Sequence, residues 1–186
     1  MAIFFTADPH FGHANIIEYC KRPFSSVEEM DETLIARWNE RITGRDDVYV
    51  IGDFAYKSAR THMESVFRRL NGRKHLVIGN HDSKYTLRLP WASKPEHRVR
   101  LKIDGALWVL DHYAQRAWEG MERGSFHVFG HTHARLPGVG RSTDVGVDAW
   151  DFWPVTPAEV MERIQVMNVE PYDPYFEPAA PRVLAG

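Results

Sequence analysis

Histidine, aspartate and asparagine residues follow short apolar runs in this sequence. Five runs end in such residues: 2–7 before Asp8, 48–51 before Asp53, 75–78 before Asn80, 107–110 before His112, and 126–129 before His131. Runs of this length are typical of strands, several of them buried on both faces. Because ligands of open α/β sheets bind beyond the carboxyl ends of the strands, we expect these side chains to lie together.

Two pairs of these residues have the spacing of chelating ligands. Asp8 and His10 lie two residues apart, as do His131 and His133. In an extended segment, side chains two residues apart leave the same face, so each pair is suited to hold one ion. A glycine precedes the polar residue at the second and third runs, where it allows a sharp turn beside a crowded centre.

The set as a whole points to more than one metal ion. Carboxylates, imidazoles and an amide oxygen together exceed the four ligands of a tetrahedral zinc site. They suit two ions about 3.5–4 Å apart that share a bridging carboxylate, as used for in-line displacement at phosphorus. Mixed nitrogen and oxygen ligation accommodates Mn, Fe, Zn or Ni and does not choose among them. A single strand-end Asp or His is usually a turn former, so the ordered series carries the prediction.

Helices must lie between the strands to position these residues. Ser26 and Glu29 have the spacing of a capping box, and apolar residues recur every four positions from 30 to 42. We expect a second amphipathic helix over 63–70 and a third that begins at Thr156. Strand–helix alternation followed by a strand-rich stretch predicts an α/β fold with a mixed sheet or two stacked sheets.

Length and composition limit the architecture and the substrates. The 186 residues suit one domain, expected over 1–168, with a proline-rich tail over 169–186. The single cysteine excludes an internal disulfide and a cysteine-rich zinc site. We recognise no signal peptide or membrane span, so a cytoplasmic location without membrane partners is expected. Basic clusters are short and the net charge is −2, which makes long nucleic acid an unlikely substrate. The oligomeric state is left open.

The motif series resembles a known superfamily. The segments DPH (8–10), GD (52–53), GNHD (79–82), DH (111–112) and GHTH (130–133) resemble, in this order, the calcineurin-like metallophosphoesterases. The stretch FTADPHFGHANIIEYCKRPF is similar to their small bacterial and phage members. The resemblance implies a sandwich of mixed β-sheets flanked by helices. It also implies a binuclear enzyme that hydrolyses phosphomonoesters or phosphodiesters by attack of a metal-bound hydroxide.

The resemblance also implies roles for individual residues. One ion would be held by Asp8, His10, Asp53 and His133, and the other by Asp53, Asn80, His112 and His131. His81 would contact the phosphate or protonate the leaving oxygen, with Asp82 orienting its ring.

The substrate side of the site is less defined by the sequence. His13, Asn15 and Arg22 are candidates for substrate binding, although a helix cap or a surface salt bridge explains them equally well. Tyr113 and Ala114 replace a common Tyr-Pro pair, which affects the shape of the neighbouring loop. A small phosphate ester is the preferred substrate. The alternatives are a non-catalytic scaffold of the same fold and a nuclease.

Overall fold

The computed structural model describes residues 1–167, which form two β-sheets and their covering helices. The first sheet is parallel, in the order β1 (Ile3–Thr6), β2 (Asp47–Ile51), β3 (Arg73–Val77). The second has the order β4 (Arg98–Ile103), β5 (Ala106–Asp111), β6 (Phe126–Phe129), β7 (Ser142–Asp144). Only the β4–β5 pair is antiparallel, so this sheet is mixed. The predicted fold class is confirmed, and the predicted tail lies outside the described residues.

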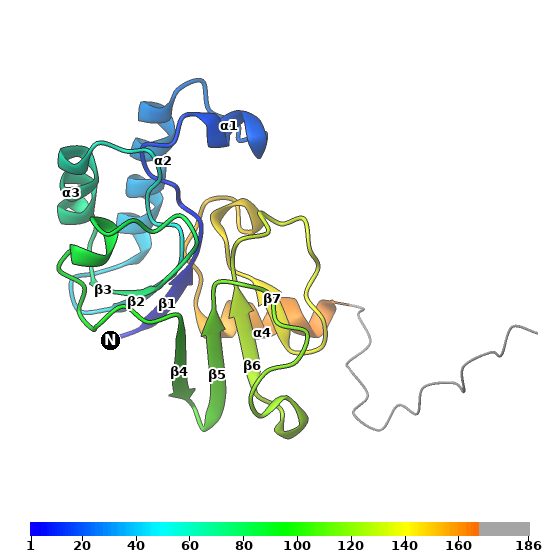
Figure 1. The fold of residues 1–186 in the computed structure, drawn as a ribbon. Helices are drawn as coiled ribbons and strands as arrows, with labels where there is room; N and C mark the ends of the chain where they lie inside the picture. Colours follow the sequence, from blue (N-terminus) through cyan, green and yellow to red (C-terminus); the bar gives the residue numbers. More distant parts are fainter. Residues whose placement is uncertain (168–186) are drawn as a thin grey trace, which may run out of the picture.

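Four α-helices connect and cover the sheets (Figure 1). They are α1 (Asn15–Tyr19), α2 (Val27–Arg41), α3 (Arg60–Arg69) and α4 (Pro157–Val166), with single 3₁₀ turns at 86–88, 121–123 and 147–149. None of the helices within residues 1–167 has the length and apolarity needed to cross a membrane.

Capping residues define where two of the helices begin. Thr156 and Glu159 form a complete capping box, in which each side chain accepts from the backbone N–H of the other residue. Ser26 caps α2 by accepting from the N–H of Glu29, at 3.2 Å. The Glu29 carboxylate accepts instead from the N–H and hydroxyl groups of Ser25. The box predicted at α2 is therefore only half formed.

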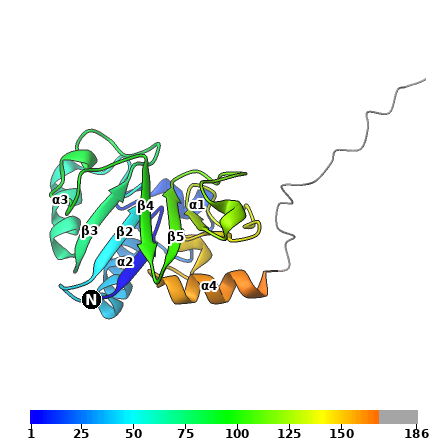
Figure 2. The ribbon, with the colours of Figure 1, turned by 90° about the horizontal axis from the view of Figure 1, so that it is seen from below.

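Two apolar clusters hold the layers together. The first lies between the first sheet and helices α2 and α3; it includes Met30, Leu34, Trp38, Val50 and Phe67. The second joins the two sheets; it includes Phe5, Ile51, Trp108, Leu110 and Val128. The α4 helix contacts β1 and β7, and Figure 2 shows it running alongside the sheets in the view from below.

The strands that end in polar residues all run in the same direction. Strands β1 to β3 are mutually parallel, and so are β5 to β7. The two sets are aligned by a parallel bridge between Ala7, just after β1, and Gly146, just after β7. The carboxyl ends of both sheets therefore face one side of the molecule, where polar side chains from distant parts of the sequence meet.

Candidate metal centre

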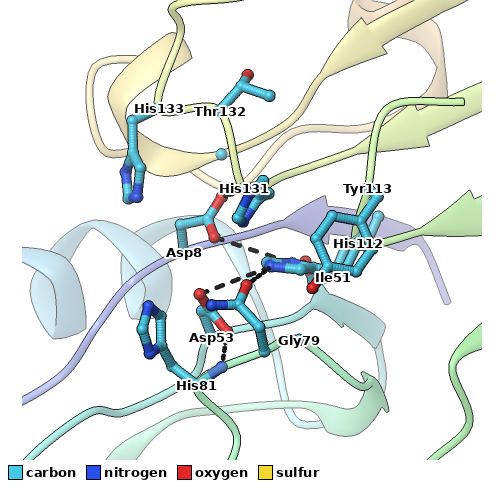
Figure 3. Close-up of polar contacts among 12 residues, drawn as sticks. Asp8, Ile51, Asp53, Gly79, His81, His112, Tyr113, His131, Thr132 and His133 are labelled. Carbon is cyan, nitrogen blue, oxygen red and sulfur yellow. Dashed lines mark hydrogen bonds and ion pairs between the residues drawn. The ribbon is translucent and has the colours of Figure 1, made fainter.

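Two groups of potential metal ligands lie beyond these strand ends. Within each group, the ligand atoms lie within 4.8 Å of one another: Asp8, His10 and His133 in the first, and Asp53, His112 and His131 in the second. Figure 3 shows the side chains of both groups, apart from His10, directed toward a common space. The two groups divide the histidines and carboxylates as the resemblance implies.

The Asp53 carboxylate lies between the two groups. Its Oδ2 is 3.5 Å from Nε2 of His10 and 3.6 Å from Nε2 of His112. Its Oδ1 accepts a hydrogen bond of 2.8 Å from the backbone N–H of His81. One oxygen is thus held by the backbone, while the other faces both groups, as a bridging ligand requires.

Asn80 and His112 present two lone pairs to each other. The Nδ1 of His112 lies 3.0 Å from the carbonyl oxygen of Ile51, where it donates a hydrogen bond. A neutral His112 then carries a lone pair at Nε2, which lies 2.9 Å from Oδ1 of Asn80. A cation bound by both atoms would satisfy this arrangement.

Unpartnered buried atoms test whether these residues fit a metal. Asp8 Oδ1 and both ring nitrogens of His10 are buried and have no hydrogen-bond partner within residues 1–167. A buried polar atom without a partner costs free energy, so such atoms are rare unless they have a ligand. Nitrogen and oxygen donors of this kind suit divalent transition metals. The residues therefore fit metal ions at this position.

The backbone at the centre departs from the extended geometry predicted for the two pairs. Strand β1 ends at Thr6, and both Asp8 and His10 have left-handed backbone, with φ of 55° and 53°. His131 and His133 have φ of 67° and 49° and contribute to different groups rather than to one. Left-handed conformations are uncommon in residues other than glycine and cluster at functional sites. Local turns therefore direct these side chains, and the alternation of a strand does not.

Burial and neighbouring charges shift the pKa values of the centre. Burial, followed by the charge of His133, lowers the pKa of His10 to about 2, so its ring is neutral. Burial raises the pKa of Asp8, and burial lowers that of His131. Burial also lowers the pKa of His133, but hydrogen bonds to Asp148 and Cys20 outweigh it and raise the value to about 10. An ion that binds His133 must therefore displace a proton.

Asp82 does not orient the His81 ring, which corrects the role expected for it. Its carboxylate accepts from the backbone N–H groups of Asp53, Phe54 and Gly79 at 2.8–3.0 Å. It therefore fixes the loops that carry Asp53 and Asn80. The His81 ring packs instead against Tyr56, with the ring centroids 4.1 Å apart, and lies 5.5 Å from the His10 ring.

The three candidates for substrate binding occupy different environments. His13 is buried beside His10, 5.4 Å between ring centroids, and its Nδ1 has no partner within residues 1–167. Asn15 is exposed at the start of α1. Arg22 is buried behind the centre and donates to Asp148 and to the backbone carbonyls of Asp8 and Pro9. The structure therefore does not support substrate binding by Arg22, because its guanidinium is already engaged.

Sequence reasoning missed two carboxylates that support the centre. Asp148 accepts from Nδ1 of His133 at 2.7 Å, and hydrogen bonds from His133 and Arg22 outweigh burial to lower its pKa to about 2. Asp144 accepts from the hydroxyl of Thr132 and the N–H of Ala134. Both lie at or after the end of β7, so the same strand-end argument would have found them had that strand been recognised.

Comparison with known proteins gives matches at the level of sequence and fold. No family model matches the sequence. The gene 66 protein of Mycobacterium phage D29 is 30% identical over 182 residues, which covers 80% of this chain and 88% of the phage protein. The chain belongs to the family of this phage gene 66 protein. Its motif series resembles that of the calcineurin-like metallophosphoesterases, and its two sheets flanked by helices have the α/β arrangement that this resemblance implies.

Two further matches come from Methanocaldococcus jannaschii and Aquifex aeolicus. An uncharacterized protein of Methanocaldococcus jannaschii is 46% identical over 81 residues, 43% of this chain. The aligned part spans only 46% of the archaeal protein's length. The solved structure of a protein of unknown function from Aquifex aeolicus has a TM-score of 0.73 at 21% identity. The match covers 88% of the present chain and 99% of the Aquifex chain, so the present chain shares the fold of the Aquifex protein.

Proposed function

We propose that this protein is a binuclear, metal-dependent phosphoesterase that hydrolyses small phosphate esters. The observation that carries the proposal is the Asp53 carboxylate, whose Oδ2 faces His10 of one ligand group and His112 of the other. A carboxylate shared in this way is the hallmark of two-ion centres that act on phosphate esters. In the proposal, Asp8, His10, Asp53 and His133 hold one ion, and Asp53, Asn80, His112 and His131 hold the second.

Divalent ions at such a centre lower the pKa of a water molecule to about 7 and offset the charge on phosphate oxygens. The protein itself orients the side chains that would bind these ions. The backbone N–H of His81 holds Oδ1 of Asp53, and Ile51 holds the His112 ring through Nδ1. These contacts fix the direction of two ligands before any ion arrives, and outer contacts of this kind tune metal affinity.

His81 is the proposed proton donor to the leaving oxygen. Its ring has no hydrogen bond within the described residues, and it lies against the Tyr56 ring and 5.5 Å from the His10 ring. An imidazole can give a proton near neutral pH without binding a metal. His13 faces the same side and packs against Tyr56, with 4.8 Å between ring centroids. We propose that His13 contacts the substrate.

Several features favour a small ester over long nucleic acid. The net charge is −2, and the buried guanidinium of Arg22 behind the centre is already engaged by Asp148. A duplex binder needs several phosphate contacts from Lys or Arg. The sequence has only short basic clusters, which favours a small ester over a long polyanion.

Metal-dependent turnover tests the proposal. Chelator-stripped protein is assayed with p-nitrophenyl phosphate and bis-p-nitrophenyl phosphate, before and after addition of Mn²⁺, Zn²⁺, Ni²⁺ or Fe²⁺. We expect turnover of at least one ester only after a metal is restored. A protein that binds two ions but hydrolyses neither ester would favour a scaffold of this fold over an enzyme.

A further inference from the structure

Arg22, Asp148 and His133 form a hydrogen-bonded series that ends at the first ligand group. The Nδ1 of His133 donates to Oδ2 of Asp148 at 2.7 Å. Arg22 donates to both oxygens of Asp148 at 2.8 Å, through Nε and Nη2. The side chains of Arg22 and Asp148 are 0% and 8% exposed, so these hydrogen bonds are screened little by water.

Arg22 also holds the opposite side of the same ligand group. Its Nη2 donates to the carbonyl oxygen of Asp8 at 2.8 Å, and its Nη1 donates to that of Pro9 at 3.0 Å. The guanidinium therefore links the turn that carries Asp8 and His10 to the carboxylate that holds His133. These segments lie more than a hundred residues apart in the sequence.

Asp148 also determines which nitrogen of His133 is available. A carboxylate only accepts, so the Nδ1 it contacts carries the proton, and Nε2 is left as the ring nitrogen with a lone pair for an ion. From this geometry we infer that Asp148, held by Arg22, is a positioning residue that orients His133 for one ion and leaves the second ion's ligands unaffected. This inference rests on the proposed two-ion centre.

The second ligand group has different supports. Asp53 is held by the N–H of His81, and His112 by the carbonyl oxygen of Ile51. The structure gives no hydrogen bond from Asp148 or Arg22 to either residue. Removal of the Asp148 carboxylate should therefore weaken one ion selectively, whereas general damage to the fold would weaken both.

The protein contains a matched control for this test. Asp47, at the start of β2, is also a buried carboxylate that binds one histidine and one arginine. Its Oδ1 accepts from Nε2 of His75 at 2.9 Å, and its Oδ2 accepts from Arg73. It lies at the opposite end of its strand from Asp53. Asp47→Asn therefore breaks the same kind of triad away from the ligands.

The first experiment measures stepwise metal affinity by native mass spectrometry. Stripped wild-type protein, Asp148→Asn and Asp47→Asn are titrated with Mn²⁺ against a chelator. We expect Asp148→Asn to raise the dissociation constant of one binding step by about 10- to 100-fold, the usual effect of losing such a partner. The dissociation constant of the other step should stay within threefold of the wild-type value. For Asp47→Asn, the dissociation constants of both steps should stay within threefold of the wild-type values. If Asp148→Asn weakens both steps equally, or neither, the inference is wrong. If the wild type binds no ion, the proposed function itself fails.

Arg22 without its partner is a buried charge, so Asp148→Asn could fold poorly. The double variant Arg22→Met with Asp148→Asn removes both charges and should show the same selective loss. A second measurement uses the wild type alone. Nitrogen-15 NMR of histidine-labelled, zinc-loaded protein should show His133 bound through Nε2 with a retained Nδ1 proton, assigned by comparison with His133→Gln. Zinc bound at Nδ1 of His133 would overturn the inference without depending on how any Asp148 variant folds.

Discussion

The backbone N–H of His131 donates a hydrogen bond of 2.7 Å to Oδ2 of Asp8, although the two residues lie 123 positions apart. This bond joins the first strand end of the chain to the last of the five motifs. The other carboxylate oxygen, Oδ1 of Asp8, is buried and has no hydrogen-bond partner among residues 1–167, so it is available to an ion. The neighbouring Gly130 allows the approach, because a Cβ there would lie 2.6 Å from both Asp8 Oδ2 and the Ala7 Cβ.

Gly130→Ala should therefore damage both the fold and the first ion site. The added methyl group would overlap Ala7 and push the Asp8 carboxylate away, and overpacking of this kind typically costs about 1–3 kcal/mol. Urea unfolding and metal content of the variant check this result. Gly44→Ala is the control, since a Cβ there meets nothing within 4 Å, and its stability should change by less than about 0.5 kcal/mol. Equal effects of the two substitutions would contradict the close approach.

His81→Ala should separate the proposed acid from the ligands. Because His81 offers its backbone and not its ring to Asp53, metal content should stay intact while turnover falls roughly 10²- to 10⁴-fold. The loss should be smaller for a p-nitrophenyl ester, whose leaving group needs little protonation. His131→Ala should lose metal and activity together on every ester. Loss of an ion from His81→Ala, or equal impairment whatever the leaving group, would rule out the acid role.

Acid should weaken the fold through Asp46. Hydrogen bonds from the backbone of Ala2 and from Thr43 lower the pKa of Asp46 to about 2. A carboxyl with a lowered pKa contributes stability above its unfolded pKa of about 3.9 and loses it as the pH falls to about 2. The free energy of unfolding of metal-free protein should therefore exceed that of Asp46→Asn at pH 7, with the gap closing between pH 4 and pH 2. A gap that does not depend on pH would contradict this account.

Substrate size should show in the salt dependence of the reaction. Because the basic clusters of the sequence are short, kcat/KM for small phosphate esters should exceed that for duplex DNA. It should also change little between 50 and 200 mM salt, a range over which a binder with about six to ten phosphate contacts loses roughly 10³- to 10⁵-fold in affinity. Rates on both substrates across this range provide the check. Efficient duplex cleavage with a steep salt slope would favour a nuclease.

The strands that sequence reasoning identified are those with continuous apolar runs. Each such run corresponds to β1, β2, β3, β5 or β6 in the structure. Strand β7 (Ser142–Asp144) has the sequence STD and is buried throughout, so no apolar signal marks it. Strand β4 (Arg98–Ile103) alternates charged, exposed residues with half-buried ones, as an edge strand does. The location of these two strands depends on their pairing partners, which local sequence does not reveal.

The motif order predicted which residues meet at the centre, but not how each side chain is directed. The left-handed backbone at Asp8 and His131 replaces the strand geometry assumed from residue spacing. The Asp82 carboxylate accepts hydrogen bonds from three backbone N–H groups and does not bind the ring of its neighbour His81. Arg22 meets Asp148 across 126 positions. The orientation of each of these side chains depends on contacts with residues far away in the sequence, and local sequence does not reveal those contacts.

The rate of ester hydrolysis as a function of metal equivalents tests the central claim most directly. Stripped protein is titrated with the best-activating ion, and turnover of the preferred p-nitrophenyl ester is measured at each step, for the wild type and for Asp53→Asn. Because Asp53 faces both ligand groups, the wild-type rate should rise until two equivalents are bound, and Asp53→Asn should stay inactive at every step. A wild-type rate that is complete at one equivalent, or an Asp53→Asn variant with full activity, would contradict a two-ion centre bridged by Asp53.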